Sequence, residues 1–243
     1  MKRKLFLLTF CTLLVIGLGF YWRTREFSEQ VFYDFYFENE PVVNKKALEK
    51  ILSDFEIVAV QNLPKATLEA SKMNIPPYRE MVASCKFYKL KKKDVYRKIA
   101  GNIRIKDLIS KDAAYRNSWY FSGTPLYWGI DKRILFKLLE LQQTLKTRGY
   151  NPDGFRVSTG HRTPAFNEAL NGASKSRHIL GEAVDLTIGD IDGNGRYTEA
   201  DKNMVLELCE KEIIKNEGGI GRYPGTRVVH IDVRGFRARW DKY

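Results

Sequence analysis

The sequence predicts an α+β fold in which an antiparallel sheet carries helices packed on one face. Residues 183–188 and 226–234 are rich in β-branched side chains and alternate in the way that strands do. Residues 130–148 instead repeat leucine and isoleucine at the spacing of one buried helix face, and Gly149 follows in the place of a helix C-cap. The chain therefore combines strand-forming and helix-forming segments.

The overall composition is that of a folded globular protein. Hydrophobic residues make up 44% of the 243 residues and charged residues 29%, which excludes a disordered or low-complexity chain. This length allows one large domain or two modest ones.

The N-terminus carries an export signal. Three basic residues follow Met1 and precede an apolar run over residues 5–21. Because no small-x-small cleavage site follows, we expect an uncleaved single-pass transmembrane helix with its N-terminus inside, and a tether that ends at residue 26; a removed signal peptide is the alternative. Phe10 stands before Cys11 where a lipoprotein needs a small residue, which excludes that class.

The formal net charge of +12 suits a polyanionic partner. Nucleic acid fits by sign but not by location, because export places the domain in the periplasm or outside the cell. We expect no nucleic-acid partner, and we expect anionic lipid head groups of the inner membrane or wall polymers to provide the opposite charge.

Residues 27–125 form a region to which the sequence assigns no chemistry. Asn44 can cap a helix that runs to Phe55, and residues 57–60 have the pattern of a strand. An aromatic, turn-rich stretch marks a boundary near residue 125, so residues 126–243 are predicted to form the second domain.

The chain contains two cysteines besides Cys11. Cys85 and Cys209 follow no metal-binding pattern and are too few for a disulfide framework. Outside the cytoplasm they can form one bridge, and two unrelated buried thiols are the alternative.

Two segments of the second domain carry side chains that can bind a metal. His178 and Asp185 are separated by Gly181, which allows a tight turn between a loop imidazole and a strand carboxylate. His230 and Asp232 lie two apart in the other strand and therefore share a face. Two imidazoles and one carboxylate leave a fourth tetrahedral position free, which is typical of catalytic zinc.

Three motifs in chain order carry a resemblance to a known family. They are Ser158-Thr159-Gly160-His161-Arg162-Thr163-Pro164, Ser176-x-His178-x-x-Gly181-x-Ala183-x-Asp185 and Val229-His230-x-Asp232. They resemble the zinc D-alanyl-D-alanine peptidases of the lysostaphin and hedgehog fold group, most of all the branch of Gram-negative murein endopeptidases and D-Ala-D-Ala carboxypeptidases. His161 stands where tyrosine is common. The resemblance covers about residues 130 to 240.

The resemblance implies that His178, Asp185 and His230 bind zinc at the centre of the sheet. It also implies that Arg162 holds the scissile carbonyl or the substrate carboxylate, for which the fixed fork of a guanidinium is suited. Ser176 and Asn167 are expected to brace the surrounding loops.

The general base is less directly indicated by the resemblance. Relatives place an acid three residues before the last histidine, or use a His-x-His pair, but Arg227 occupies the first of these places. We expect Asp232 to take the proton from the water that zinc would activate. In a rival arrangement Asp232 is the ligand and His230 the base.

A second metal motif follows the strand of Asp185. Over residues 190–201 oxygen-bearing side chains recur at EF-hand positions, with Gly195 at the sharp turn. The expected calcium ligands are Asp190, Asp192, Asn194, Arg196 through its carbonyl, and Asp201. Position twelve is Asp201 rather than glutamate, and a turn without an ion is the alternative.

Together these observations predict a zinc metallopeptidase that hydrolyses peptide bonds in the stem peptides or cross-links of bacterial peptidoglycan. Carboxypeptidase and endopeptidase action both stay open at this point. The competing class is a wall-binding or adaptor protein that keeps the fold and metal without turnover.

Overall fold

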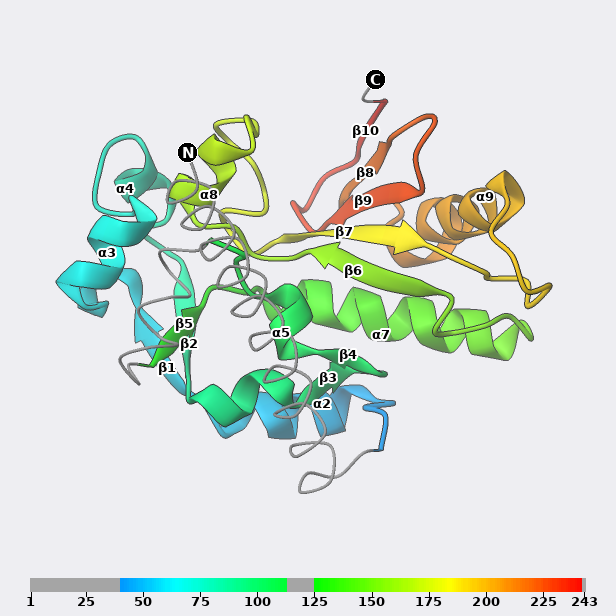
Figure 1. Ribbon diagram of the computed structural model, residues 1–243, viewed down its shortest axis with the longest axis horizontal. Coiled ribbons are helices and arrows are strands. Elements are labelled where there is room, and N and C mark those ends of the chain that lie inside the picture. The colour runs from blue at the N-terminus through cyan, green and yellow to red at the C-terminus, as the bar shows by residue number, and fades with distance from the viewer. Residues whose placement is uncertain (1–39, 113–124, 242–243) are drawn as a thin grey trace, which may run out of the picture. The chain divides into compact units, whose positions relative to one another are not determined.

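The computed structural model of the chain describes residues 40–112 and 125–241 (Figure 1). The predicted transmembrane helix and its tether, residues 1–26, lie outside these ranges. Within them, no helix is both long enough and apolar enough to span a bilayer.

A five-stranded sheet forms the centre of the C-terminal half. Its strands are β6 (Phe155–Thr159), β7 (Ala183–Ile188), β8 (Gly219–Arg222), β9 (Val228–Asp232) and β10 (Ala238–Asp241), in the order β10-β8-β9-β7-β6. The predicted strands at 183–188 and 226–234 are confirmed as β7 and β9, although β9 is shorter than predicted.

The sheet is antiparallel from β6 through β8, as predicted, but β10 runs parallel to β8. After β9 the chain reverses at Gly235, where φ is +89°. It then passes to the outer edge of β8 instead of pairing with β9, and its direction therefore matches that of β8.

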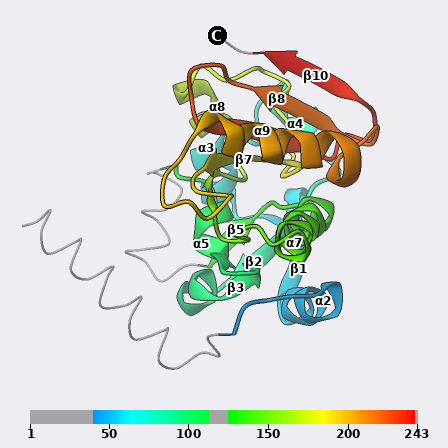
Figure 2. The same ribbon diagram turned by 90° about the vertical axis from the view of Figure 1, so that its right-hand side faces the viewer.

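Helix α7 (Lys132–Thr147) confirms the helix predicted over 130–148. Asp131 caps it by accepting a hydrogen bond from the Arg133 amide, and the leucines and isoleucine of the predicted face are buried. The helix runs alongside β6 and β7 (Figure 1), and in Figure 2 it is seen nearly end-on. Its buried face packs into the core beneath the sheet.

Two shorter helical elements complete this half. Helix α8 (Pro164–Ala169) is capped by Thr163, and α9 (Glu199–Leu208) continues into a π-helical turn, η3 (Cys209–Ile213). Helix α9 contacts β7, and η3 contacts α7.

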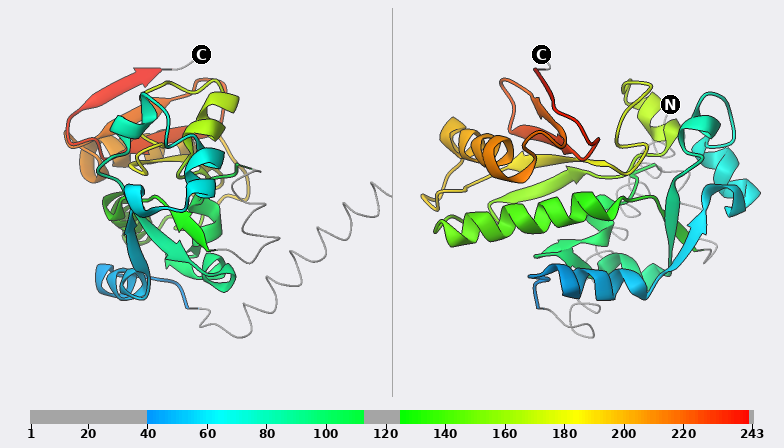
Figure 3. Two further views of the ribbon diagram at one scale, coloured as in Figure 1. Left: turned by 90° about the vertical axis from the view of Figure 1, so that its left-hand side faces the viewer. Right: turned by 180° about the vertical axis from the view of Figure 1, so that it is seen from behind.

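A smaller antiparallel sheet joins the two halves of the sequence. Its strands are β1 (Glu56–Ala59), β2 (Lys86–Leu90) and β5 (Leu126–Trp128), in the order β1-β2-β5. Figure 3 shows this sheet from two further sides. Because β5 pairs with β2, the first strand of the predicted second domain completes a sheet that begins in the preceding region.

The remaining elements surround this smaller sheet. They are α2 (Lys45–Ser53), η1 (Val60–Asn62), α3 (Lys65–Ser71), α4 (Tyr78–Met81), η2 (Lys92–Tyr96), β3 (Lys98–Ala100), β4 (Ile103–Arg104) and α5 (Ile105–Leu108). Asn44 caps α2 as predicted, by accepting from the Ala47 amide at 2.8 Å. Cys85 and Cys209 are free thiols and form no bridge; Cys209 is buried, as the alternative predicted, but Cys85 is only half-buried.

Candidate metal centre

The register of β7 and β9 brings the first two candidate ligands together. Asp185 lies directly opposite His230 in this antiparallel pair. Residues opposite each other in such a pair project from the same face. Val184 and Ile231, which form the neighbouring pair, face the other way and are fully buried. A register shift of one residue between the two strands would turn one of these ligands toward the apolar core and separate the pair.

The third ligand reaches this face from a loop. His178 precedes Gly181, whose φ of +68° favours glycine. A side chain at position 181 would also clash with the carbonyl of Gly129. The Gly181 amide donates to the His178 carbonyl at 3.1 Å and closes the turn. Gly181 thus allows the loop to fold back over the sheet, as the sequence predicted.

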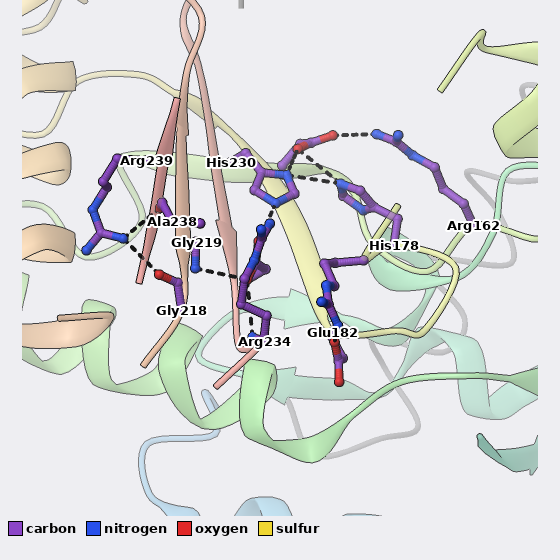
Figure 4. A network of polar contacts seen from close by, with 12 residues as sticks. Arg162, His178, Glu182, Gly218, Gly219, His230, Arg234, Ala238 and Arg239 are labelled. Carbon is purple, nitrogen blue, oxygen red and sulfur yellow. Dashed lines mark hydrogen bonds and ion pairs between the residues drawn. The ribbon is translucent and has the colours of Figure 1, made fainter. Parts of the chain in front are cut away.

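Three side-chain atoms converge at this face (Figure 4). The Nε2 of His178 lies 3.2 Å from both the Oδ1 of Asp185 and the Nδ1 of His230, and the last two atoms are 2.8 Å apart. Ligands of a tetrahedral zinc at ~2.0–2.1 Å would be separated by about 3.3 Å. All three residues are buried. The spacing therefore fits zinc.

The hydrogen bond on the outer side of the His178 ring fixes its tautomer, and His230 has a carboxylate at each nitrogen. The Nδ1 of His178 lies 2.8 Å from the carbonyl oxygen of Gly160, which can only accept, so Nδ1 carries the proton. The His230 ring lies between two carboxylates, with its Nε2 3.1 Å from Asp232 and its Nδ1 2.8 Å from Asp185, so either nitrogen can carry the proton. With the proton on the Nε2 of His230, both inner nitrogens would offer lone pairs beside the Asp185 oxygen. Such a set repels itself unless a cation lies between, which also fits zinc.

The local electrostatics are compatible with metal binding. Burial lowers the pKa of His178 and outweighs the attraction of Asp185, so this imidazole stays neutral. Burial would raise the pKa of Asp185, but His178 and His230 together hold it well below its usual range. For His230, hydrogen bonds to Asp185 and Asp232 outweigh burial and raise the pKa. A proton on His230 therefore competes with a metal in acid.

Arg162 joins the cluster through Asp185. Its Nη2 donates to the outer oxygen, Oδ2, at 2.5 Å, while Oδ1 faces the two imidazoles. The Arg162 amide also donates to the His178 carbonyl at 3.0 Å. The guanidinium thereby fixes the orientation of the carboxylate, and its role toward substrate stays a prediction.

Asp232 lies beyond the His230 ring rather than inside the cluster. It is fully buried and accepts hydrogen bonds from the Gly219 amide at 2.9 Å and from the Arg234 guanidinium at 2.6–3.1 Å. Its contact with the outer nitrogen of His230 is that of a carboxylate that orients a metal-binding imidazole. This position favours orientation over proton acceptance, and it favours His230 over Asp232 as the ligand.

Sequence reasoning did not assign roles to two neighbours of His230. Arg234 continues the alternation of His230 and Asp232, so spacing alone could have indicated it. Trp240 had no such signal: its ring lies 5.1 Å from that of His230. The register aligns Trp240 with Gly221 and Gly221 with His230. A Cβ at Gly221 would lie 2.7–2.8 Å from the indole, so glycine makes room for it.

The two predicted bracing residues differ in their contacts. The buried Asn167 donates from its side chain to the Ala173 carbonyl at 3.1 Å, on the loop that leads to His178. Ser176 contributes through its backbone, where its carbonyl accepts from the Ile179 amide at 3.1 Å. Asn167 thus connects α8 to the loop before His178, and Ser176 lies in the turn that precedes this ligand.

The second predicted metal loop gathers three carboxylates. Oxygens of Asp190, Asp192 and Asp201 lie within 4.8 Å of one another. Asp190 accepts from the amide of Gly195, and Asp201 accepts from the amides of Ile191, Asp192 and Thr198. These bonds hold Asp201 as part of the cap of α9. Calcium binding at this loop stays a prediction.

Comparison with known proteins identifies part of the chain. The family model Peptidase_M15_2, described as peptidoglycan L,D-endopeptidase MepK, matches residues 126–240. No curated protein and no solved structure matches the chain. The match confirms the resemblance to the zinc D-Ala-D-Ala peptidases, and it contains all three converging ligands.

A buried histidine beside the cluster gives a prediction about acid stability. His161 is buried, and burial together with His178 lowers its pKa from 6.5 to about 3. As the pH falls below 6.5, His161 becomes protonated in the unfolded chain, whereas in the folded chain it stays neutral down to about pH 3. Across that pH range, protonation of His161 in the unfolded chain should lower the free energy of unfolding of the wild type by roughly 2–5 kcal/mol.

The measurement is the slope of unfolding free energy against pH, taken on metal-free protein by denaturant titration. His161→Leu should flatten the slope between pH 6.5 and 4 relative to wild type, whatever its absolute stability. Equal slopes in both proteins would mean that His161 does not contribute to the pH dependence of the free energy of unfolding.

The calcium prediction is tested by thermal unfolding. Calcium should raise the melting temperature of the wild-type chain by mass action, and it should not do so for Asp190→Ala/Asp192→Ala. Magnesium serves as the control ion. The same calcium response in both proteins would exclude the loop as a site.

Proposed function

We propose that residues 126–240, which match the Peptidase_M15_2 family model, form a zinc peptidase that cleaves within the peptide cross-links of peptidoglycan. The family model is described as a peptidoglycan endopeptidase, which favours an internal bond over removal of a terminal residue. The observation that carries the proposal is the convergence of His178, Asp185 and His230, whose ligand atoms lie 2.8–3.2 Å apart.

These three residues would hold the ion. When bound, zinc would lower the pKa of a coordinated water and polarise the scissile carbonyl. Three protein ligands leave a position for water or substrate, as catalytic zinc sites require. Asp185 contributes one oxygen to the ion, while its other oxygen is occupied by Arg162.

Arg162 has a second proposed task. Within the described residues only its Nη2 donates a side-chain hydrogen bond, so the guanidinium retains donors for a substrate oxygen. A fixed cation beside the reacting carbonyl would stabilise the negative charge that develops on that oxygen. Asp232 would act through His230, by fixing the orientation and basicity of the ring.

Action on peptidoglycan implies a periplasmic or extracellular location. The basic N-terminus and apolar run favour delivery there by an uncleaved membrane helix, which would leave the domain facing the wall. The net positive charge suits a surface close to anionic lipids and wall polymers.

The test is incubation of the zinc-loaded full chain with intact sacculi, followed by mass identification of the released muropeptides. Cross-linked dimers should decrease and monomers increase, without release of free D-alanine. Release of D-alanine alone would contradict the endopeptidase assignment. Zinc bound with no product from several sacculus types would favour the adaptor alternative.

Variants separate metal binding from turnover. His178→Ala should lose zinc and all cleavage. Arg162→Ala should still bind zinc at saturating metal but lower kcat by about 10²–10³-fold, because it removes a donor to the transition-state charge. Arg148→Ala is the matched control, since that arginine pairs with Glu212 on the helical side of the domain. Equal losses in Arg162→Ala and Arg148→Ala would contradict the role of Arg162.

A further inference from the structure

We infer that residues 108–112, which lie outside the family match, position the loop that orients two of the metal ligands. We refer to residues 108–112 as the brace and to residues 160–163 as the arginine loop. The inference rests on the proposed function, and it assigns a task in that function to the region that the sequence left without one. Its positioning residues are Ser110 and Asp112.

The arginine loop orients two residues of the cluster through hydrogen bonds to their outer atoms. Its first residue, Gly160, accepts from the Nδ1 of His178 at 2.8 Å and so fixes the tautomer of that ring. Arg162 donates to Asp185 at 2.5 Å. The loop connects β6 to α8 and has no regular structure of its own. Its position must therefore be fixed by contacts with other segments.

The brace supplies these contacts, and successive residues of the brace contact successive positions of the arginine loop. The His161 amide donates to the Leu108 carbonyl at 2.9 Å, and the Thr163 amide donates to the Ser110 hydroxyl at 3.2 Å. The Thr163 hydroxyl then donates to the Asp112 carboxylate at 2.7 Å. Each contact lies on one side or the other of Arg162, so the brace holds both flanks of that residue.

These contacts are inside the protein. Ser110 is 1% exposed, Asp112 is 8% exposed and Thr163 is fully buried. A buried hydrogen bond to a charged group is stronger than one between neutral groups, and a buried partner left without it is costly. A water molecule is therefore a poor substitute for the Asp112 carboxylate at this buried position.

The packing around the loop depends on the same region. A side chain at Gly160 would clash with the Leu108 backbone, so the two segments touch directly. The His161 ring packs edge-on against Phe87 of β2 at 5.8 Å between centroids. Trp128 of β5 donates to the Leu108 carbonyl at 3.3 Å and ties the brace to the smaller sheet. Figure 1 shows α5, where the brace begins, beside the end of β6.

The decisive comparison uses three variants of the full chain. Asp112→Ala removes the acceptor of Thr163, whereas Asp112→Asn keeps an oxygen that can accept. Asp94→Ala is the matched control, because Asp94 is also 8% exposed and accepts a backbone hydrogen bond from the amide of Lys91, the residue before η2. All three are first compared for zinc content and melting temperature.

In a peptidoglycan-peptide assay, Asp112→Ala should lower kcat by about 10–100-fold with a smaller change in KM, as expected when a reacting group is displaced by a fraction of an ångström. Asp112→Asn should restore most of kcat, and Asp94→Ala should leave it near wild type. In an Arg162→Ala background, Asp112→Ala should add little further loss. Equal losses in Asp112→Ala and Asp94→Ala would overturn the inference.

Hydrogen exchange tests the brace without any cleavage assay. The amides of His161 and Thr163 should exchange faster in Asp112→Ala than in wild type, and at the wild-type rate in Asp94→Ala. Unchanged exchange in Asp112→Ala would overturn the inference even in an active enzyme. Faster exchange in a protein that cleaves nothing would instead support the brace and reject the proposed function.

Discussion

The structure depends on one cross-strand pair, Asp185 opposite His230 in β7 and β9. Because side chains alternate between the two faces of a strand, one register determines both faces. The register that buries Val184 and Ile231 in the core also places the Asp185 carboxylate and the His230 imidazole together on the opposite face. The hydrophobic core and the candidate metal centre are therefore two consequences of one register. His178 needs only a tight turn to meet them.

Each ligand is then held by a different partner outside the cluster. The Gly160 carbonyl holds His178, Arg162 holds Asp185, and Asp232 holds His230. Two buried carboxylates are matched by the guanidinium groups of Arg162 and Arg234, which keeps ionised groups paired. Because every outer hydrogen-bonding position of the rings is filled, the inner atoms are preorganised to receive a cation.

The sequence predicts the parts of this arrangement that are local. Period-two alternation locates β7 and β9 and puts His230 and Asp232 on one face, and the glycine between His178 and Asp185 indicates the turn. Sequence spacing does not show on which side of the His230 ring Asp232 lies, since both positions satisfy the same alternation. The parallel placement of β10, the indole of Trp240 and the brace at Ser110 and Asp112 arise from contacts between residues far apart in the chain, which leave no periodic signal.

The central claim is that one zinc ion lies between the inner nitrogens of His178 and His230 and the Oδ1 of Asp185. Crystals of the zinc-loaded protein, measured on both sides of the zinc absorption edge, test it directly through the anomalous difference map. The account predicts a single strong peak at about 2.0–2.1 Å from these three atoms. A peak bound by Asp232, a peak on the outer nitrogen of His230, or no peak at this face would contradict it.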